Sequence, residues 1–120
     1  MDWQKLNMKE VKYYCTTSQV DFDCLPFSWQ IERIMVIFYY YGIKVFQAED
    51  IKEFYKLLQM QNPRSEGIRK PSLTQIVKVI TRLSNIQCIE ENGFEILEVD
   101  AIMYEHYKNE IQYGYEKGSI

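Results

Sequence analysis

The sequence is poor in the residues that build most catalytic and metal sites. No serine or cysteine motif frames a nucleophile around its single histidine, His106, and no glycine-rich loop is present to hold a phosphate group. Cys15, Cys24 and Cys88, together with His106, have the atom types of a zinc site, but they match no familiar ligand spacing. We therefore expect a protein that is not an enzyme and that binds no metal or other cofactor.

Long apolar runs are absent as well. The longest uncharged apolar run near the centre, residues 34–41, is far shorter than the ~20 residues that a membrane helix needs. The first residues do not form a basic leader followed by an apolar stretch, so no signal peptide is expected. Three cysteines cannot all pair, which favours reduced thiols. These absences predict an intracellular location, cytoplasmic or nuclear, and no membrane partner.

What is present is the composition of an ordinary globular domain. Of the 120 residues, 47% are hydrophobic and 26% are charged, which is typical of neither a disordered nor a fibrous chain. A chain of this length is expected to bury one core of its own without disulfides or metal.

The clearest local signal is a helix start in the second half of the chain. Ser72 and Gln75 have the S-x-x-Q spacing of a capping box, in which each side chain pairs with a backbone amide. The residues that follow place an apolar arc on one side of a helix and hydrogen-bond donors on the other. The apolar arc comprises Leu73, Ile76, Val77, Ile80 and Leu83. We expect an amphipathic helix that begins at Leu73 and stops at Asn85, a residue that tolerates the left-handed conformation.

A β-hairpin is predicted directly after this helix. Residues 86–90 and 94–99 are rich in β-forming residues and are separated by Glu91, Asn92 and Gly93. Asn-Gly is the strongest short hairpin signal, because a type I′ turn needs a positive φ at both central residues.

Two helices are expected in the first half of the chain. Residues 29–41 form the first, N-capped by Ser28 and ended by Gly42, and its apolar residues extend almost all the way round, which predicts burial on several sides. Because this run is also β-branched and aromatic, a buried strand is the alternative. A short strand at 43–46 precedes the second helix, residues 48–60, whose acidic first turn matches the helix dipole.

The remaining segments have weaker patterns. Residues 1–14 are expected to form a helix and residues 15–27 an extended connection. Residues 61–70 have a loop composition, and this loop is longer than the about three or four residues of a compact helix-turn-helix. Asp100 is expected to cap a last helix at 101–113, followed by a tail that frays.

Positive charge is concentrated in one part of the chain. Residues 62–82 have five bases against one acid, whereas residues 1–61 have seven bases against eight acids and residues 83–120 have two against eight. Lysine and arginine bind phosphates, and polar side chains at a helix N-terminus reach base edges or backbone. The candidate nucleic-acid-binding residues are Arg64, Arg69, Lys70, Thr74, Gln75, Lys78 and Arg82.

Two other features favour a protein partner. Glu90, Glu91 and Glu95 surround the hairpin turn and repel a phosphate backbone within a Debye length, and the sequence pI is about 5.2. Tyrosines of the last helix, among them Tyr104 and Tyr107, are residues that mark partner surfaces where they are exposed, although core packing is their ordinary use. The last helix also offers a contact for a homodimer.

The order of helix, short strand, helix, loop, capped helix, Asn-Gly hairpin and last helix over residues 28–113 resembles the winged helix-turn-helix superfamily. The resemblance implies a mainly α fold with a small β-hairpin (α+β) and extra N- and C-terminal helices. Residues 1–27 would be an N-terminal helix and extended connection, residues 28–99 the winged-helix core, and residues 100–120 a C-terminal helix and tail.

This resemblance implies two classes of function. Small transcription regulators of the superfamily bind duplex DNA through the third helix, which implies contacts from Arg69, Lys70, Thr74, Gln75, Lys78 and Arg82. Other members, in single-strand-binding and telomere-capping complexes, bind proteins, and the acidic hairpin is more similar to those. We expect a small regulator or accessory protein that binds nucleic acid, DNA in the first place, through the third helix and its preceding basic loop. The alternative is a protein-interaction module, in a nucleic-acid-processing complex or as a mimic of a phosphate backbone.

Overall fold

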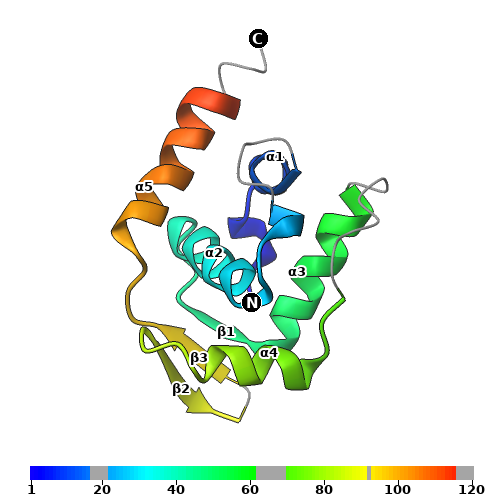
Figure 1. The fold of residues 1–120 in the computed structure, drawn as a ribbon, viewed down its shortest axis with the longest axis vertical. Helices are drawn as coiled ribbons and strands as arrows, with labels where there is room; N and C mark the ends of the chain where they lie inside the picture. The colour runs from blue at the N-terminus through cyan, green and yellow to red at the C-terminus, as the bar shows by residue number, and fades with distance from the viewer. Residues whose placement is uncertain (17–21, 62–69, 92, 116–120) are drawn as a thin grey trace.

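The protein is mainly helical and has one small antiparallel sheet. A computed structural model describes residues 1–16, 22–61, 70–91 and 93–115. Its helices and strands are α1 (Met8–Thr16), α2 (Phe27–Tyr40), β1 (Val45–Gln47), α3 (Ala48–Gln61), α4 (Leu73–Ile80), β2 (Ile86–Glu90), β3 (Gly93–Ile96) and α5 (Ala101–Asn109) (Figure 1). Short 3₁₀ helices at Trp3–Lys5 and Phe22–Cys24 flank α1, and α5 continues as a π-helical segment, Glu110–Tyr115. The expected α+β class is thereby confirmed.

The sheet has the strand order β1-β3-β2, with both neighbouring pairs antiparallel. Phe46 of β1 lies opposite Phe94 of β3, their ring centroids are 5.7 Å apart, and both side chains are 2% exposed. Phe38 of α2 meets Phe46 edge-on at the same centroid distance, 5.7 Å. One face of the sheet is therefore packed on the helices through stacked aromatic rings, and the sheet lies at one end of the helical body (Figure 1).

Helix α2 lies at the centre of the molecule, where it packs against both α4 and α5 (Figure 1). Its side chains are buried around almost the whole helix, as the apolar pattern predicts, and the buried ones are Gln30, Ile31, Ile34, Met35, Val36, Ile37 and Phe38. A helix that is apolar all round is stable in water only when neighbours cover every side. The alternative of a buried strand in this run is wrong.

Gln30 is a polar side chain inside this core, with only 1% of its surface exposed. Its amide nitrogen donates to the carbonyl oxygens of Phe22, at 2.9 Å, and Leu25, at 3.2 Å. Its amide oxygen accepts from the hydroxyl of Tyr55, at 2.8 Å. A buried amide costs little when all its atoms are paired, so Gln30 holds the chain before α2, α2 itself and α3 together.

The ends of α2 differ in how well they are predicted. At the C-terminus, Gly42 has a φ of 81°, its amide donates to Tyr39, and the amide of Ile43 donates to Phe38, which is the Schellman arrangement. The expected stop at Gly42 is confirmed. At the N-terminus the expected cap by Ser28 is wrong, because the helix already begins at Phe27 after Pro26, whose ring fixes a φ suited to a helix start.

Helix α4 begins as predicted and ends early. The hydroxyl of Ser72 accepts from the amide of Gln75, and the amide of Ser72 donates to the Gln75 side chain, so the capping box is complete. The helix ends at Ile80, not at Asn85, because the next turn tightens into i to i+3 hydrogen bonds. Asn85, directly before β2, is bonded instead to the segment that follows β3. Its side chain donates to the carbonyl of Glu98, and its own carbonyl accepts from the amide of Leu97.

The other expected elements shift by a few residues. The expected strand at 43–46 lies at 45–47 and the helix at 48–60 reaches Gln61, while β3 ends at Ile96 because the Leu97 amide pairs outside the strand. The hairpin is confirmed, although Asn92 of its turn lies outside the described residues.

The two terminal helices are confirmed in part. The expected helix at 1–14 is divided into a short 3₁₀ helix and α1, and α1 extends into the segment expected to be an extended connection. Asp100 caps α5 through the amide of Met103, at 2.9 Å. The helical path after it reaches Tyr115 rather than residue 113.

A chain of polar contacts ties the two terminal helices to α2. The hydroxyl of Tyr41 donates to a carboxylate oxygen of Glu10 at 2.7 Å, and it lies 2.8 Å from the hydroxyl of Tyr107. Because the proton of Tyr41 is engaged with Glu10, the hydroxyl of Tyr107 is the donor in the second bond. Tyr107 is 0% exposed, so this bond satisfies a group that water does not reach.

We predict that Tyr41→Phe destabilises the protein more than Tyr107→Phe does. Removing the Tyr41 hydroxyl leaves that of Tyr107 buried without its acceptor and costs about 1–3 kcal/mol, whereas Tyr107→Phe keeps the bond to Glu10 and costs about 0.5–1.5 kcal/mol. Urea unfolding followed by circular dichroism measures both. Tyr104→Phe is the matched control, because no hydrogen bond of the Tyr104 hydroxyl to a described residue is seen. An equal or larger cost for Tyr107→Phe would contradict the assigned donor.

Candidate nucleic-acid interface

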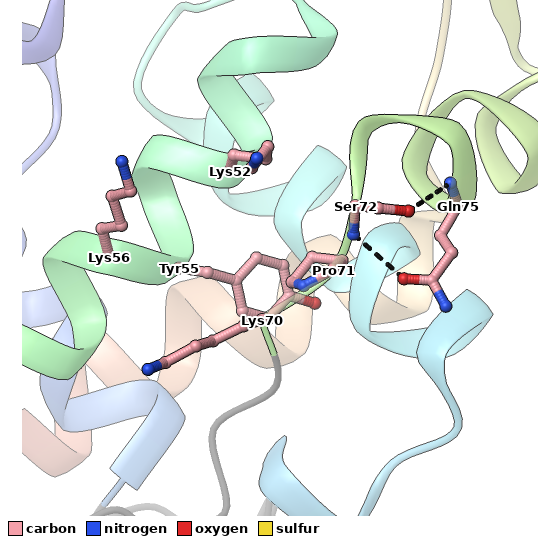
Figure 2. A pocket seen from close by; sticks show the side chains of 7 residues that line it. All are labelled: Lys52, Tyr55, Lys56, Lys70, Pro71, Ser72 and Gln75. Carbon is pink, nitrogen blue, oxygen red and sulfur yellow. Dashed lines mark hydrogen bonds between the residues drawn. The ribbon is translucent and has the colours of Figure 1, made fainter.

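A pocket of about 540 Å³ lies between α3 and the start of α4. Lys52 and Lys56 reach it from α3 and Lys70 from the segment before α4 (Figure 2). Tyr55, Pro71, Ser72 and Gln75 complete the lining. Three lysine side chains, the rings of Tyr55 and Pro71 and the capping box of a helix thus line the pocket, and the ends of the three lysines point in different directions (Figure 2).

Local structure explains why these side chains meet. Lys52 and Lys56 are four residues apart on α3, so they share one face of that helix. Helix α4 packs against α3, which places its N-terminus beside that face. Pro71 is buried directly before the cap residue Ser72 and fixes the chain there.

Tyr55 at the floor of the pocket is held from the core side. It is 2% exposed, its hydroxyl donates to Gln30, and its ring lies 6.3 Å from that of Phe22 and 6.4 Å from that of Phe27. The inner face of α3 comprises Ile51, Phe54, Tyr55 and Leu58, all of which are buried. The position of the pocket floor is therefore set by core packing and not by solvent-exposed contacts.

The predicted nucleic-acid-binding residues divide into two groups. Arg64 and Arg69 lie outside the described residues. All the others, namely Lys70, Thr74, Gln75, Lys78 and Arg82, are exposed. Thr74 and Lys78, with Leu73 and Val77, line a second pocket of about 450 Å³ on α4. Gln75 lines the first pocket and Lys78, three residues later on α4, lines the second. The two pockets are therefore neighbours along α4.

The capping box limits which atoms of the Gln75 side chain can contact a nucleic acid. Its side-chain oxygen accepts from the amide of Ser72 at 3.0 Å, so this oxygen is occupied in the fold. The side-chain nitrogen makes no hydrogen bond to another described residue, and in Figure 2 it points away from the cap. Gln75 therefore has donors to offer a ligand, and a two-way contact through both amide atoms would break the cap.

Sequence analysis missed Lys52 and Lys56 as site residues. The sequence places Lys52 and Lys56 four residues apart on one helix, but no local pattern predicts that the start of α4 packs against that helix. Across the described part of the chain, no carboxylate lies within ion-pair distance of Lys52, Lys56 or Lys70; the single ion pair is that of His106 with Glu110. Glu49 and Glu53 are exposed on the same helix as Lys52 and Lys56.

The candidate protein-docking residues lie in different environments. Glu90 and Glu91 are exposed at the hairpin tip, and Glu95 is half-buried on β3. Tyr104 is half-buried, with its ring 6.1 Å from Tyr39. Tyr107 is fully buried. Its expected role at a partner surface is a misreading, because this side chain faces the core of the same chain.

Helix α5 packs along α2 and leaves a few apolar side chains outside. Ile102 is 81% exposed and Tyr113 is 61% exposed. Such single residues are ordinary on a protein surface. The homodimer expected through the last helix stays a prediction.

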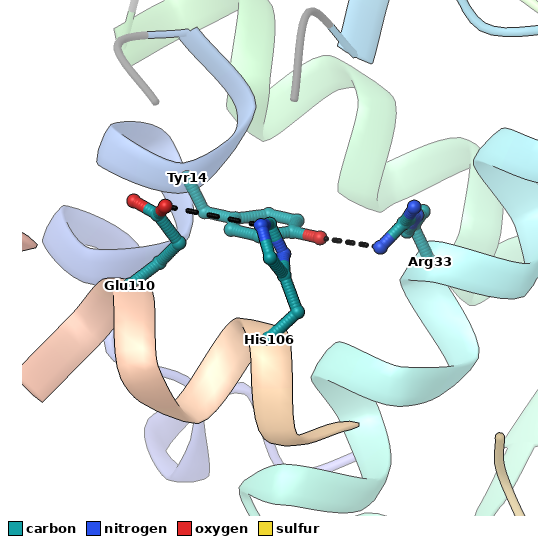
Figure 3. Close-up of polar contacts among 4 residues, drawn as sticks. All are labelled: Tyr14, Arg33, His106 and Glu110. Atoms are coloured by element: carbon teal, nitrogen blue, oxygen red, sulfur yellow. Dashed lines mark hydrogen bonds and ion pairs between the residues drawn. The ribbon is translucent and has the colours of Figure 1, made fainter. Parts of the chain in front are cut away.

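The single histidine lies beside a second polar cluster. His106 is 3.8 Å from Glu110 on the next turn, and Arg33 donates to the hydroxyl of Tyr14 at 3.1 Å (Figure 3). The imidazole meets the Tyr14 ring edge-on, with centroids 6.0 Å apart. These contacts join α1, α2 and α5 around a buried tyrosine, which is the arrangement of a packing contact between helices.

The three cysteines do not converge. Cys15 is buried, Cys24 and Cys88 are exposed, and no two of them form a disulfide with each other. Within the described ranges no group of three or more His, Cys, Asp or Glu side chains lies close enough to hold a metal ion. In the same ranges no helix is both long and apolar enough to cross a membrane.

Comparisons with known proteins find no matching family model, no similar curated protein and no similar solved structure. Function therefore has to be inferred from the residues and their geometry.

We predict that the protein loses stability in alkali. Burial raises the pKa of the Cys15 thiol from 9.0, and burial also raises the pKa values of Tyr14, Tyr41 and Tyr107 from 10.0. The unfolded chain releases these protons at a lower pH than the folded one, so stability is complete below about pH 9 and falls above it. Each such group adds a slope of up to about 1.4 kcal/mol per pH unit.

Urea unfolding between pH 7 and pH 11 measures this loss. Tyr107→Phe removes one titrating group, so its stability falls less steeply above pH 10 than that of the unaltered protein. Identical slopes for the two proteins would contradict the prediction.

Proposed function

We propose that the chain is a winged helix-turn-helix protein that binds nucleic acid through α4 and the lysines of α3 beside it, without catalysis. The observation that carries the proposal is the α3–α4 pocket, which is lined by Lys52, Lys56 and Lys70, three lysines without ion-pair partners among the described residues. Lysine is a common binder of phosphate, and phosphate contacts supply most of the affinity for nucleic acid.

The order of the elements supports the winged-helix assignment. From α2 onward the chain runs helix, strand, helix, helix, hairpin, helix, and the strand between the first two helices pairs with the hairpin in the order β1-β3-β2. In the helix-turn-helix arrangement the second helix of the motif enters the major groove with its N-terminal residues foremost. Helix α4 occupies that place in this chain, with Thr74 and Gln75 exposed in its first turn.

The spacing of the cations supports the same face. Lys78 lies four residues after Thr74 and three after Gln75, so all three share one side of α4, and Arg82 follows in the turn after the helix. Lys78 and Arg82 are thus two exposed cations, four residues apart, along α4 and the turn after it. Side chains in such a row neutralise successive phosphates.

The acidic hairpin limits how a duplex would lie. Glu90 and Glu91 are exposed at the tip of the β2–β3 hairpin, where a wing would meet a phosphate backbone. Carboxylates repel phosphates over a Debye length of about 8 Å at physiological salt. We therefore propose that the ligand contacts α3 and α4 and leaves the hairpin tip in solvent or to a protein partner.

We predict salt-dependent binding to nucleic acid that requires α4. Fluorescence anisotropy with labelled random duplex DNA, single-stranded DNA and RNA is expected to show micromolar binding at ~50 mM salt, and about four phosphate contacts would weaken it ~100-fold at ~200 mM. The double variant Lys78→Glu with Arg82→Glu is expected to abolish binding and to keep the fold, because both side chains are exposed.

The matched control is Lys5→Glu with Lys9→Glu, which makes the same change in net charge at exposed positions of the N-terminal segment. Full binding by this control, with loss in the α4 variant, would assign the interface. Retained binding by the α4 variant would mean that the face is wrong. No binding of any probe at the lower salt would reject the function and favour a protein partner at the acidic hairpin.

A further inference from the structure

Strand β2 is an edge of the sheet. In the strand order β1-β3-β2 it has β3 as its one neighbour, and it lies at the border of the molecule (Figure 1). Residues 87–90 of this strand are all exposed. An edge strand presents backbone amides and carbonyls that no neighbouring strand pairs with, and another chain can pair with them.

The hydrogen-bond register shows which backbone groups of β2 point outward. The amide of Leu97 donates to the carbonyl of Asn85, so these two residues are a hydrogen-bonded pair. Because such pairs alternate along an antiparallel ladder, the backbone groups of Ile86 and Cys88 point away from β3. The amide of Ile86 lies 3.5 Å from the carbonyl of Leu83. The carbonyl of Ile86 and both backbone groups of Cys88 have no hydrogen-bond partner among the described residues.

The apolar face of the sheet is also open at this edge. Cys88 lies opposite Phe94 and Ile86 opposite Ile96, so the side chains of each pair share one face of the sheet. Phe94 and Ile96 are each 2% exposed, whereas Ile86 is half-buried and Cys88 is exposed. The helices thus cover this face at β3 and leave it partly uncovered at β2. Apolar side chains of an added strand would lie beside Ile86 and Cys88 and continue the same face.

The charge around this edge selects the kind of strand that pairs with it. Residues 83–100 contain four glutamates and one aspartate and no lysine or arginine. No described cation lies within ion-pair distance of these carboxylates. They repel a phosphate backbone, an acidic chain and the same hairpin of a second copy, and they attract lysine and arginine. The complementary partner is therefore a basic strand.

We propose that β2 binds an extended, basic segment of a partner protein, which adds a strand to the sheet. Backbone hydrogen bonds to Ile86 and Cys88 hold the segment, and its apolar side chains, at alternate positions, extend the helix-facing side of the sheet. Its lysine or arginine side chains lie near Glu90 and Glu91. This surface is separate from α3 and α4, so the inference goes beyond the proposed function and does not rest on it.

The first experiment is a nuclear magnetic resonance titration of the full chain with a capped peptide of about seven residues in which lysine and valine alternate. One comparison peptide has glutamate in place of lysine, and another has proline in place of valine, with the same charge but no strand pairing. We expect a dissociation constant below about 1 mM for the first peptide and at least about tenfold weaker binding of the other two. No binding of the first at about 1 mM, or equal binding of the proline peptide, would overturn the proposal.

Charge variants test the location. Glu90→Lys with Glu91→Lys is expected to weaken binding of the lysine–valine peptide at least about tenfold, because both side chains are exposed beside the edge. Glu49→Lys with Glu53→Lys makes the same change in charge at exposed positions of α3 and is expected to leave binding unchanged. An equal loss in both double variants, or none in the first, would mean that the assigned edge is wrong.

The backbone contact is tested at Cys88. Cys88→Pro removes the outward amide and is expected to weaken binding at least about tenfold, whereas Cys88→Val keeps this amide and binds like the unaltered chain. Hydrogen exchange in the unaltered chain gives a readout that does not depend on the folding of the proline variant. The peptide is expected to slow exchange of the Cys88 amide. An unchanged exchange rate would show docking through side chains alone and would contradict strand pairing.

Sedimentation of the chain alone tests a second copy as the occupant. We expect a monomer at about 100 μM, because two acidic hairpins repel each other. A dimer that Cys88→Pro dissociates would assign the edge to a second copy and would overturn the basic partner.

Discussion

The structure depends on the need to cover α2 on every side. This helix has almost no polar face, so it cannot lie at a surface, and each neighbour has to contribute apolar side chains to it. Apolar burial alone does not fix how the helices are oriented, and the hydrogen bonds of its one buried polar residue, Gln30, do so. The amide nitrogen of Gln30 donates to two carbonyls before α2, and its amide oxygen accepts from the hydroxyl of Tyr55 on α3. The relative position of α2 and α3 follows from both. Since Tyr55 is also the floor of the α3–α4 pocket, the geometry of the candidate site is fixed from the core outward.

Several of the side chains that cover α2 are tyrosines, whose hydroxyl groups are brought into the interior with the rings. Tyr14, Tyr41 and Tyr107 bring large rings between α1, α2 and α5, and each hydroxyl then finds Arg33, Glu10 or another hydroxyl inside the protein. Tyrosine supplies apolar area and a donor in one side chain. An abundance of tyrosine in this sequence is thus mostly a feature of packing between the terminal helices and α2, and a partner surface needs other residues.

Local chemistry decides which parts of the fold are readable in the sequence. The Ser72–Gln75 capping box, the glycine stop at Gly42, the Asp100 cap and the hairpin are each encoded within a few residues, and the structure has them all. The predicted start of α2 is wrong because both Pro26 and Ser28 are start signals, and the proline is the one that the helix uses. Helix α4 ends before Asn85 because the side chain of Asn85 donates a hydrogen bond to the carbonyl of Glu98, a residue distant in sequence. The pocket could not be predicted for the same reason. Lys52 and Lys56 are separated in sequence from Ser72 and Gln75, and only the packing of α4 on α3 brings them together.

The acidic total charge of the chain and the proposed nucleic-acid-binding face are compatible because charges act over short distances in salt solution. With a Debye length of about 8 Å at physiological salt, a phosphate on α4 responds to the cations beside it and little to carboxylates on the far side of the molecule. No described carboxylate lies within ion-pair distance of Lys52, Lys56 or Lys70, and the acids of the hairpin tip, Glu90 and Glu91, lie on a different element. Under the proposed function these acids would repel a phosphate backbone from the hairpin tip and leave α3 and α4 as the contact face.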